Sequence, residues 1–211
     1  QRQMCIRDRD KTVLDLACPA LTIDGRTLCR DIRLTVRAKD KLCICGKNGV
    51  GKSTLLRLIR DTLEKRADLR VFYMPQDPGG LLDPRLSPVE LLSPSGEKDA
   101  RSRAGLLLGS MKFTADEMNH PCAWLSGGQK AKLMFLMMAE SRADVLLLDE
   151  PTRNLSPLSG PVVRNLFADY PGCIIAVSHD RRFVEAVCTR AVRLEREGAR
   201  EARFPTLYDE F

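Results

Sequence analysis

The sequence has no long hydrophobic run, few aromatic residues and only two histidines among its 211 residues. Its apolar stretches are a few residues long, so we expect no direct membrane insertion. Aromatic residues make up 5% of the chain, which argues against platforms that stack nucleic-acid bases. With so few histidines and no Cys-x-x-Cys pair, the common zinc motifs are missing.

The rest of the composition describes a globular domain with scattered charge. Apolar residues make up 44% of the chain, enough for a buried core, and the net charge is +6. The densest basic stretch spans residues 26–41 and suits either a nucleic-acid surface or a solvated strand edge, of which we favour the edge. The eight cysteines predict reduced thiols and a cytoplasmic protein.

Residues 1–10 resemble translated sequencing-adapter read-through rather than natural protein. They contain no apolar stretch of signal-peptide length. We therefore expect a non-native leader at 1–10 and one nucleotide-binding domain over 11–211, with the natural start of the protein upstream.

Residues 46–53, Gly-Lys-Asn-Gly-Val-Gly-Lys-Ser, form a complete phosphate-binding loop. Its glycines allow the positive φ angles that turn backbone N–H groups toward phosphates, while the lysine reaches the β- and γ-phosphates and the serine binds Mg²⁺. An apolar strand at 41–45 precedes the loop and helical spacing at 53–59 follows it, so the phosphates would meet a helix N-terminus. The predicted nucleotide-binding residues are Gly46, Asn48, Gly49, Gly51, Lys52, Ser53 and Thr54.

Alternating strand and helix patterns predict an α/β fold, a P-loop NTPase with a mostly parallel sheet, an antiparallel β edge subdomain and an inserted helical lobe. Strands are expected at 12–16, 21–23, 32–36, 69–74, 145–148 and 173–177, with a turn at 24–26. Helices are expected at 130–139, 162–168 and 183–187, and an edge strand or hairpin at 192–204. The lobe, about residues 77–140, should contain helices near 89–92 and 100–108 and an N-cap at Thr114.

The strand expected at 145–148 is followed by Asp149 and Glu150. Ligands of open α/β sheets bind beyond the carboxyl ends of the strands, where these acids would emerge. Asp149 could hold Mg²⁺ through a water, and Glu150 could polarise an attacking water. A solvated turn would look the same, but the phosphate-binding loop favours hydrolysis.

Residues 125–129, Leu-Ser-Gly-Gly-Gln, open the helix expected at 130–139. Ser126 can cap that helix, while Gly127 and Gly128 would leave backbone N–H groups open to an anion. An ordinary Ser-Gly-Gly turn would give the same residues, but this one precedes Asp149 by only twenty positions.

Together, the three motifs resemble those of ATP-binding-cassette ATPases over about residues 11–211. The resemblance implies ATP and Mg²⁺ as ligands. It identifies Gln76 as the residue that senses Mg²⁺ and the attacking water, and His179 as a γ-phosphate contact. The implied catalytic residues are Glu150, His179 and Gln76, and the implied metal residues are Ser53, Gln76 and Asp149. The signature residues that would cover a partner's ATP are Ser126, Gly127, Gly128 and Gln129.

Two departures from the family pattern affect specificity and coupling. The family stacks adenine on an aromatic residue upstream of the glycine loop, where this chain has Leu21 to Leu28 with no aromatic. The preference for ATP over GTP is therefore open. After Glu150, Leu155 is followed by Ser156 where the family usually has Asp, which would alter cross-talk between paired sites.

The segments 111–118, 127–132, 150–159 and 178–183 resemble the second cassette of ABC-F proteins. ABC-F proteins carry two cassettes joined by a charged helical linker and act on ribosomes. The resemblance implies a translation factor or an antibiotic-resistance ribosome-protection factor. A second cassette, upstream in the parent chain or in a homodimer mate, would close the ATP site. We therefore expect the isolated domain to be a weak ATPase.

Two other functions compete with this interpretation. An ATP-binding subunit of an ABC membrane transporter would use the lobe to grip a permease helix. The Arg-Arg-Phe at 181–183 and the Pro-Thr-Arg-Asn at 151–154 favour ABC-F instead. A non-catalytic module that holds nucleotide as a structural ligand is disfavoured by the intact Lys52, Asp149 and Glu150.

Overall fold

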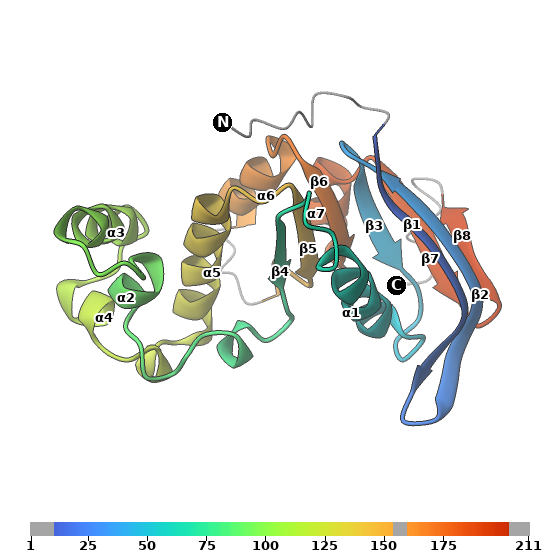
Figure 1. The fold of residues 1–211 in the computed structure, drawn as a ribbon, viewed down its shortest axis with the longest axis horizontal. Helices are drawn as coiled ribbons and strands as arrows, with labels where there is room; N and C mark the ends of the chain where they lie inside the picture. The colour runs from blue at the N-terminus through green and yellow to red at the C-terminus, as the bar shows by residue number, and fades with distance from the viewer. Residues whose placement is uncertain (1–10, 154–159, 203–211) are drawn as a thin grey trace.

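The computed structural model describes residues 11–153 and 160–202 (Figure 1). A central sheet has the strand order β4-β5-β6-β3-β7-β8, parallel throughout except for the antiparallel β7–β8 pair. Its strands are β3 (Lys41–Cys45), β4 (Val71–Met74), β5 (Val145–Asp149), β6 (Cys173–Val177), β7 (Arg190–Glu195) and β8 (Gly198–Ala202). The predicted α/β fold is confirmed, and the tail forms a hairpin. The predictions for 1–10, for Leu155 and Ser156, and for residues beyond 202 lie outside the described residues.

A second, two-stranded sheet forms the antiparallel subdomain at one end of the molecule (Figure 1). Here β1 (Thr12–Ile23) pairs with β2 (Arg26–Arg37) around a turn in which Asp24 and Gly25 have positive φ. The prediction of two separate strands at 12–16 and 21–23 is wrong, because β1 runs unbroken through Pro19. A strand with a partner on one side only can accommodate a proline, since its missing N–H need not serve the ladder.

The strands of the central sheet are buried on both faces, which explains their continuous apolar sequences. Alternate residues enter different cores. Leu42 and Val145 pack in the core that contains α1 (Lys52–Leu63) and the β1–β2 sheet. Cys43 and Leu146 pack in the core that contains α5 (Gly127–Ser141), α6 (Gly160–Ala168) and α7 (Arg181–Val187). Because β3, β4, β5, β6 and β7 run parallel, their carboxyl ends lie at one edge of the sheet.

Between β4 and α5 the described chain forms α2 (Pro88–Leu92), α3 (Lys98–Ser110) and α4 (Ala115–Asn119), with short 3-10 turns at Pro78–Gly80 and Cys122–Trp124. Figure 1 shows α2, α3 and α4 at the end of the molecule opposite the β1–β2 sheet. Capping boxes begin α2 at Ser87 and α4 at Thr114, as predicted for Thr114. We propose that residues 77–140 act as one helical lobe. Within the described residues, no helix has the length and apolar character that a bilayer-spanning segment needs.

Candidate nucleotide-binding and hydrolysis site

The phosphate-binding loop joins β3 to α1, and its glycines are required by both backbone and space. Gly46, Gly49 and Gly51 have φ of 138°, 80° and 107°. A Cβ on Gly46 would lie 2.4 Å from the carbonyl oxygen of Leu194, and one on Gly51 would lie 3.0 Å from Leu21 Cδ2. Gly51 caps α1 without any side-chain hydrogen bond. The first N–H groups of α1 are therefore left for an anion.

Lys52, the first residue of α1, folds back over the loop. Its Nζ donates to the carbonyl oxygen of Gly46 at 2.7 Å and to that of Lys47 at 3.1 Å. The residue is only 8% exposed, and burial lowers its pKa, while Glu150 opposes that shift. A buried cation held at the loop is placed to meet a phosphate charge.

Asp149 ends β5 as a buried carboxylate with an unsatisfied oxygen. The residue is 3% exposed, and its Oδ1 has no hydrogen-bond partner among the described residues. Burial raises the pKa of Asp149, and a hydrogen bond with Ser53 opposes that rise. An orphaned carboxylate oxygen beside a serine hydroxyl suits a divalent cation that takes oxygen ligands.

The metal site would be open rather than enclosed by protein. No group of three His, Cys, Asp or Glu side chains in the described parts of the chain could hold a metal ion. Mg²⁺ commonly uses one or two protein oxygens together with waters and substrate phosphates. The oxygens of Ser53, Gln76 and Asp149 fit that pattern, with Ser53 and Asp149 already in contact.

Glu150 follows Asp149 in a strained backbone conformation that directs it across the sheet edge. Its φ is 50°, and its N–H donates to the carbonyl oxygen of Val177 at 2.8 Å. Its Oε2 accepts the backbone N–H of His179 at 3.2 Å, and its Oε1 lies 3.5 Å from His179 Nε2. Burial raises the pKa of Glu150, whereas burial and Lys52 lower the pKa of His179. The pair joins the ends of β5 and β6.

These groups open into one cavity of about 610 Å³. Its lining residues are Ile23, Leu28, Asn48, Gly49, Gly51, Lys52, Ser53, Thr54, Gln76, Asp149, Glu150, Arg153, Val177 and His179. Of the predicted nucleotide-binding, catalytic and metal residues, Gly46 alone is not in this lining, because it packs against Leu194. Sequence reasoning did not place Ile23, Arg153 and Val177 in the site. Ile23 lies in the stretch 21–28 and Arg153 in the Pro-Thr-Arg-Asn segment at 151–154, but neither pattern predicted that these side chains line the cavity.

The signature residues lie elsewhere, at the N-terminus of α5. Ser126 Oγ accepts the N–H of Gln129 at 3.3 Å, and Gln129 Oε1 accepts the N–H of Ser126 at 2.8 Å. Gln129 Nε2 also donates to Glu117 Oε1 at 2.6 Å, which ties α5 to α4. None of the four signature residues lines the cavity. Ser126 and Gly127 are exposed, so this helix terminus faces outward from its own domain.

One further contact, between two of the segments that resemble ABC-F proteins, supports the hydrolytic end of the site. Thr152 Oγ1 donates to Asp180 Oδ2 at 2.9 Å, and Asp180 Oδ1 caps α7 by accepting the N–H of Arg182 at 2.9 Å. The turn after β5 is thereby tied to the turn after β6. These two turns carry Glu150 and His179.

Comparison with known proteins gives a consistent result. A family model described as ABC transporter matches residues 29–153. The chain is 33% identical over 181 residues to ABC transporter F family member 5 of Arabidopsis thaliana, covering 82% of this chain and 26% of that protein. It is 28% identical over 194 residues to the energy-dependent translational throttle protein EttA of Mycobacterium tuberculosis, covering 86% and 34%. The chain thus spans about a quarter to a third of these relatives.

A solved structure shares the fold. It is described as a dimeric, post-hydrolysis state of the ATP-binding cassette MJ0796 bound to ADP and Pi. The TM-score is 0.73 at 19% identity, and the match covers 95% of this chain and all of that one.

Proposed function

Since this chain belongs to the ABC transporter family as one of its ATPase domains, we propose that it hydrolyses ATP as one cassette of a two-cassette ABC-F protein acting on the ribosome. The buried Asp149–Glu150 pair beside the phosphate-binding loop carries the hydrolytic part of the proposal. The ABC-F name of one relative and the translational name of another support the ribosomal part.

In the proposed site, the phosphates of ATP lie against the backbone N–H groups of 46–54 and the N-terminus of α1, and Lys52 pairs with the terminal phosphates. Ser53, Asp149 and Gln76 hold Mg²⁺, which when bound neutralises charge on the β- and γ-phosphates. Loading the cation would satisfy the orphaned Oδ1 of Asp149.

Glu150 orients and polarises the attacking water in this proposal. Its raised pKa suits a general base better than that of an exposed glutamate, because a stronger base accepts a proton more readily. The backbone N–H of His179 fixes Oε2, so Oε1 is the oxygen directed to the water. His179, whose lowered pKa keeps it neutral near pH 7, contacts the γ-phosphate as a hydrogen-bond donor.

The proposed site is completed by a second cassette. Ser126 and the glycines after it face away from this chain's own cavity, so the anion they would contact belongs to a partner. The partner is the upstream cassette of the parent protein or a homodimer mate. The isolated chain is consequently a weak ATPase.

The proposed location is the cytoplasm, where ribosomes are found, consistent with the free thiols of the seven described cysteines. Within ABC-F, the chain would be a translation factor or an antibiotic-resistance ribosome-protection factor. The transporter alternative places the same ATPase beside a permease. The two functions therefore differ in the binding partner, which is the ribosome in one and a membrane protein in the other.

The test is the Glu150→Gln substitution in the parent gene, because a cassette that cannot hydrolyse ATP should remain closed on its target. We expect the variant to retain ATP and to sediment with ribosomes, and addition of Lys52→Ala to release it. ATP-dependent retention in a permease-containing membrane fraction would establish the transporter alternative. Retention in neither fraction would contradict both and favour the non-catalytic module.

A further inference from the structure

A second hollow, of about 900 Å³, adjoins the phosphate-binding loop. Its walls come from β2, from the loop itself and from the end of β7 with the β7–β8 turn (Figure 1). The residues that line it are Arg26, Thr27, Leu28, Arg30, Gly46, Lys47, Asn48, Gly49, Val50, Arg193, Leu194, Glu195 and Arg196. We call it the basic hollow. The hydrolytic residues are absent from this lining.

The charge of the basic hollow is strongly unbalanced. Among the described residues that line it, five side chains are cationic and one, Glu195, is anionic. Arg200 lies 3.9 Å from that carboxylate and offsets it. In the described parts of the chain, four of the five cations form no ion pair. They are Arg26, Arg30, Lys47 and Arg196.

Elsewhere in the molecule, arginines are commonly paired. Arg66 contacts Asp68 at 2.7 Å and Arg190 contacts both Asp40 and Glu201. Of the acids near these arginines in sequence, Glu195 lines the hollow, whereas Asp24, Asp31 and Glu197 do not. Unpaired cations gathered around a concave surface raise the local positive potential and attract an anionic ligand.

The walls of the basic hollow are fixed relative to one another. The N–H of Arg30 donates to the carbonyl oxygen of Arg196 at 2.9 Å, which joins β2 to the β7–β8 turn. Gly198 approaches β2 so closely that an added Cβ would lie 3.3 Å from the carbonyl oxygen of Asp31. The cations are therefore presented by a preorganised frame rather than by a loose loop.

We propose that the basic hollow binds the phosphate backbone of RNA, a choice of polyanion that rests on the proposed ribosomal function. Guanidinium groups contact phosphate oxygens through two parallel hydrogen bonds, and four of the five cations are arginines. Within the part of the chain that the structure describes, the lining has no aromatic side chain on which a base could stack. Binding is consequently independent of sequence and weakened by salt. Arg26 and Arg30, from the basic stretch at 26–41, would then serve a ligand rather than form only a solvated strand edge.

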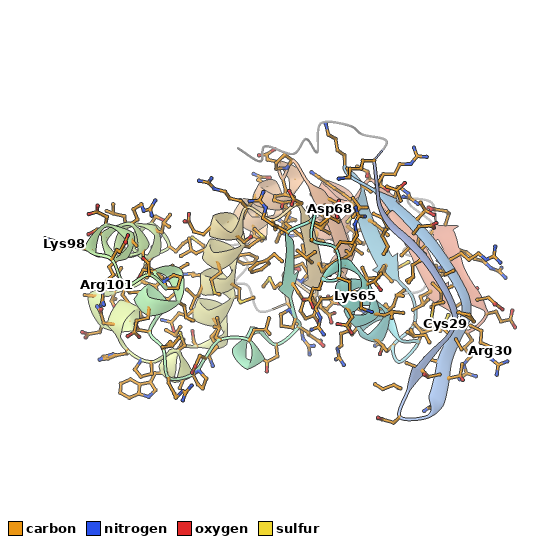
Figure 2. All side chains as sticks on the ribbon, in the orientation of Figure 1. Cys29, Arg30, Lys65, Asp68, Lys98 and Arg101 are labelled. Atoms are coloured by element: carbon orange, nitrogen blue, oxygen red, sulfur yellow. The ribbon has the colours of Figure 1, made fainter. Side chains whose placement is uncertain are left out.

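The test compares two charge reversals of equal size. Arg30→Glu with Arg196→Glu alters two exposed positions of the basic hollow. Lys98→Glu with Arg101→Glu alters two exposed positions of α3, at the far end of the molecule from Arg30 (Figure 2). Each pair changes the net charge from +6 to +2, since each substitution removes one positive and adds one negative charge. Binding of fluorescent duplex and single-stranded RNA of mixed sequence is measured by anisotropy over a range of salt concentrations.

We expect the pair in the basic hollow to weaken binding to both RNAs at least about tenfold and to reduce the salt slope by about two. The α3 pair should weaken binding by less than about threefold. Equal losses of RNA affinity in the two double variants, or no loss in the variant of the basic hollow, would overturn the proposal. So would tighter binding to anionic vesicles or to polyglutamate than to RNA, if the same residues governed it.

The basic hollow shares Leu28, Asn48 and Gly49 with the nucleotide cavity, so binding of MgATP tests whether its arginines serve a separate ligand. The double variant Arg30→Ala, Arg196→Ala should bind MgATP with wild-type affinity but lose its affinity for RNA. Its binding of MgATP also verifies that the variant folds. Loss of both ligands together would assign the hollow to the nucleotide site and overturn the proposal. Because the assay contains neither ribosomes nor a second cassette, its failure is distinct from failure of the Glu150→Gln ribosome test.

Discussion

The carboxylate of Glu150 is held by His179 from the neighbouring strand end. The backbone N–H of His179 donates to Oε2 at 3.2 Å, and its imidazole Nε2 lies 3.5 Å from Oε1. Asp149 and Val177 are register partners in β5 and β6, so the residues that follow them meet at the sheet edge. A backbone donor fixes the carboxylate whatever the imidazole's protonation state.

Replacing Glu150 by Gln should abolish turnover and spare ATP binding. The amide keeps an oxygen to accept the His179 N–H but cannot take a proton from water. We expect turnover to fall at least about a hundredfold, with nucleotide affinity changed less than about threefold. Glu140→Gln, at an exposed position of α5, should leave both values unchanged. Undiminished turnover in the Glu150 variant would remove the proposed general base.

The same substitution should stabilise the nucleotide-free protein at neutral pH. Burial raises the pKa of Glu150 above 4.5, so the folded state binds this proton more tightly than the unfolded state. Its favourable contribution is present below pH 4.5 and is lost as pH rises through the folded pKa. Gln carries no such loss, and we expect a gain of about 0.5–1 kcal/mol at neutral pH.

Chemical unfolding of both proteins across pH measures this difference. The gain should shrink toward zero as pH falls to 4.5. His179 has a lowered pKa and destabilises the folded state as pH falls below 6.5, but both proteins retain it, so its contribution largely cancels. A variant less stable than the wild type at neutral pH would show that the Glu150 carboxylate is favourably bound.

Gly51→Ala should impair both folding and nucleotide binding. Its φ of 107° is strained for alanine, and the added Cβ would approach Leu21 Cδ2 at 3.0 Å and Leu28 Cδ1 at 3.1 Å. We expect a loss of about 1–3 kcal/mol in unfolding free energy and no measurable MgATP binding by calorimetry.

Gly105→Ala is the matched control for that substitution. Gly105 lies within α3 with nothing within 4 Å of an added Cβ, so alanine should stabilise the helix by about 0.5–1 kcal/mol. Wild-type nucleotide affinity in Gly51→Ala would contradict the requirement for this backbone conformation.

Selectivity between ATP and GTP should be weak. Among the described residues, no aromatic side chain lines the cavity, and its apolar wall includes Ile23, which is 39% exposed, and Leu28. Aliphatic side chains contact a purine without reading its hydrogen-bonding groups. Competition against a fluorescent nucleotide should give affinities within about tenfold, since no hydrogen-bond readout separates the bases.

Ile23→Tyr tests the apolar wall by supplying a ring. We expect it to tighten binding of both nucleotides several-fold through stacking. GTP binding more than about a hundredfold weaker than ATP binding in the wild type would require a base-reading group that this wall lacks.

The sequence predicted most of the fold and most of the residues that line the cavity, because each motif marks a local conformation. The glycines of 46–53 determine the loop, and the apolar run before Asp149 determines the strand. Helix α5 nevertheless begins at Gly127, three residues before the predicted start. Glycine has a low helix propensity, so the sequence pattern did not indicate this first turn, which the Ser126 capping box stabilises. Leu69, predicted as strand, instead belongs to a turn closed by its N–H to the Arg66 carbonyl.

Tertiary contacts without a sequence pattern were not predictable. The Thr152–Asp180 hydrogen bond joins residues 28 positions apart, and neither residue type at its position indicates the other. The basic hollow likewise combines β2 with the β7–β8 turn. Only the packing of β2 against β8 and the β7–β8 turn brings those arginines together.

Mixing two inactive variants tests whether the ATP site is composite. Glu150→Gln keeps the signature but lacks the general base, and Ser126→Arg keeps the general base but lacks the signature. A pair of identical variant chains therefore has no complete site and should be inactive. In an equal mixture at high concentration, we expect recovery of about a quarter of wild-type turnover, because half of the pairs are mixed and each mixed pair has one complete site. Full activity of Ser126→Arg alone, with turnover per molecule independent of chain concentration, would show that a single chain forms a complete site.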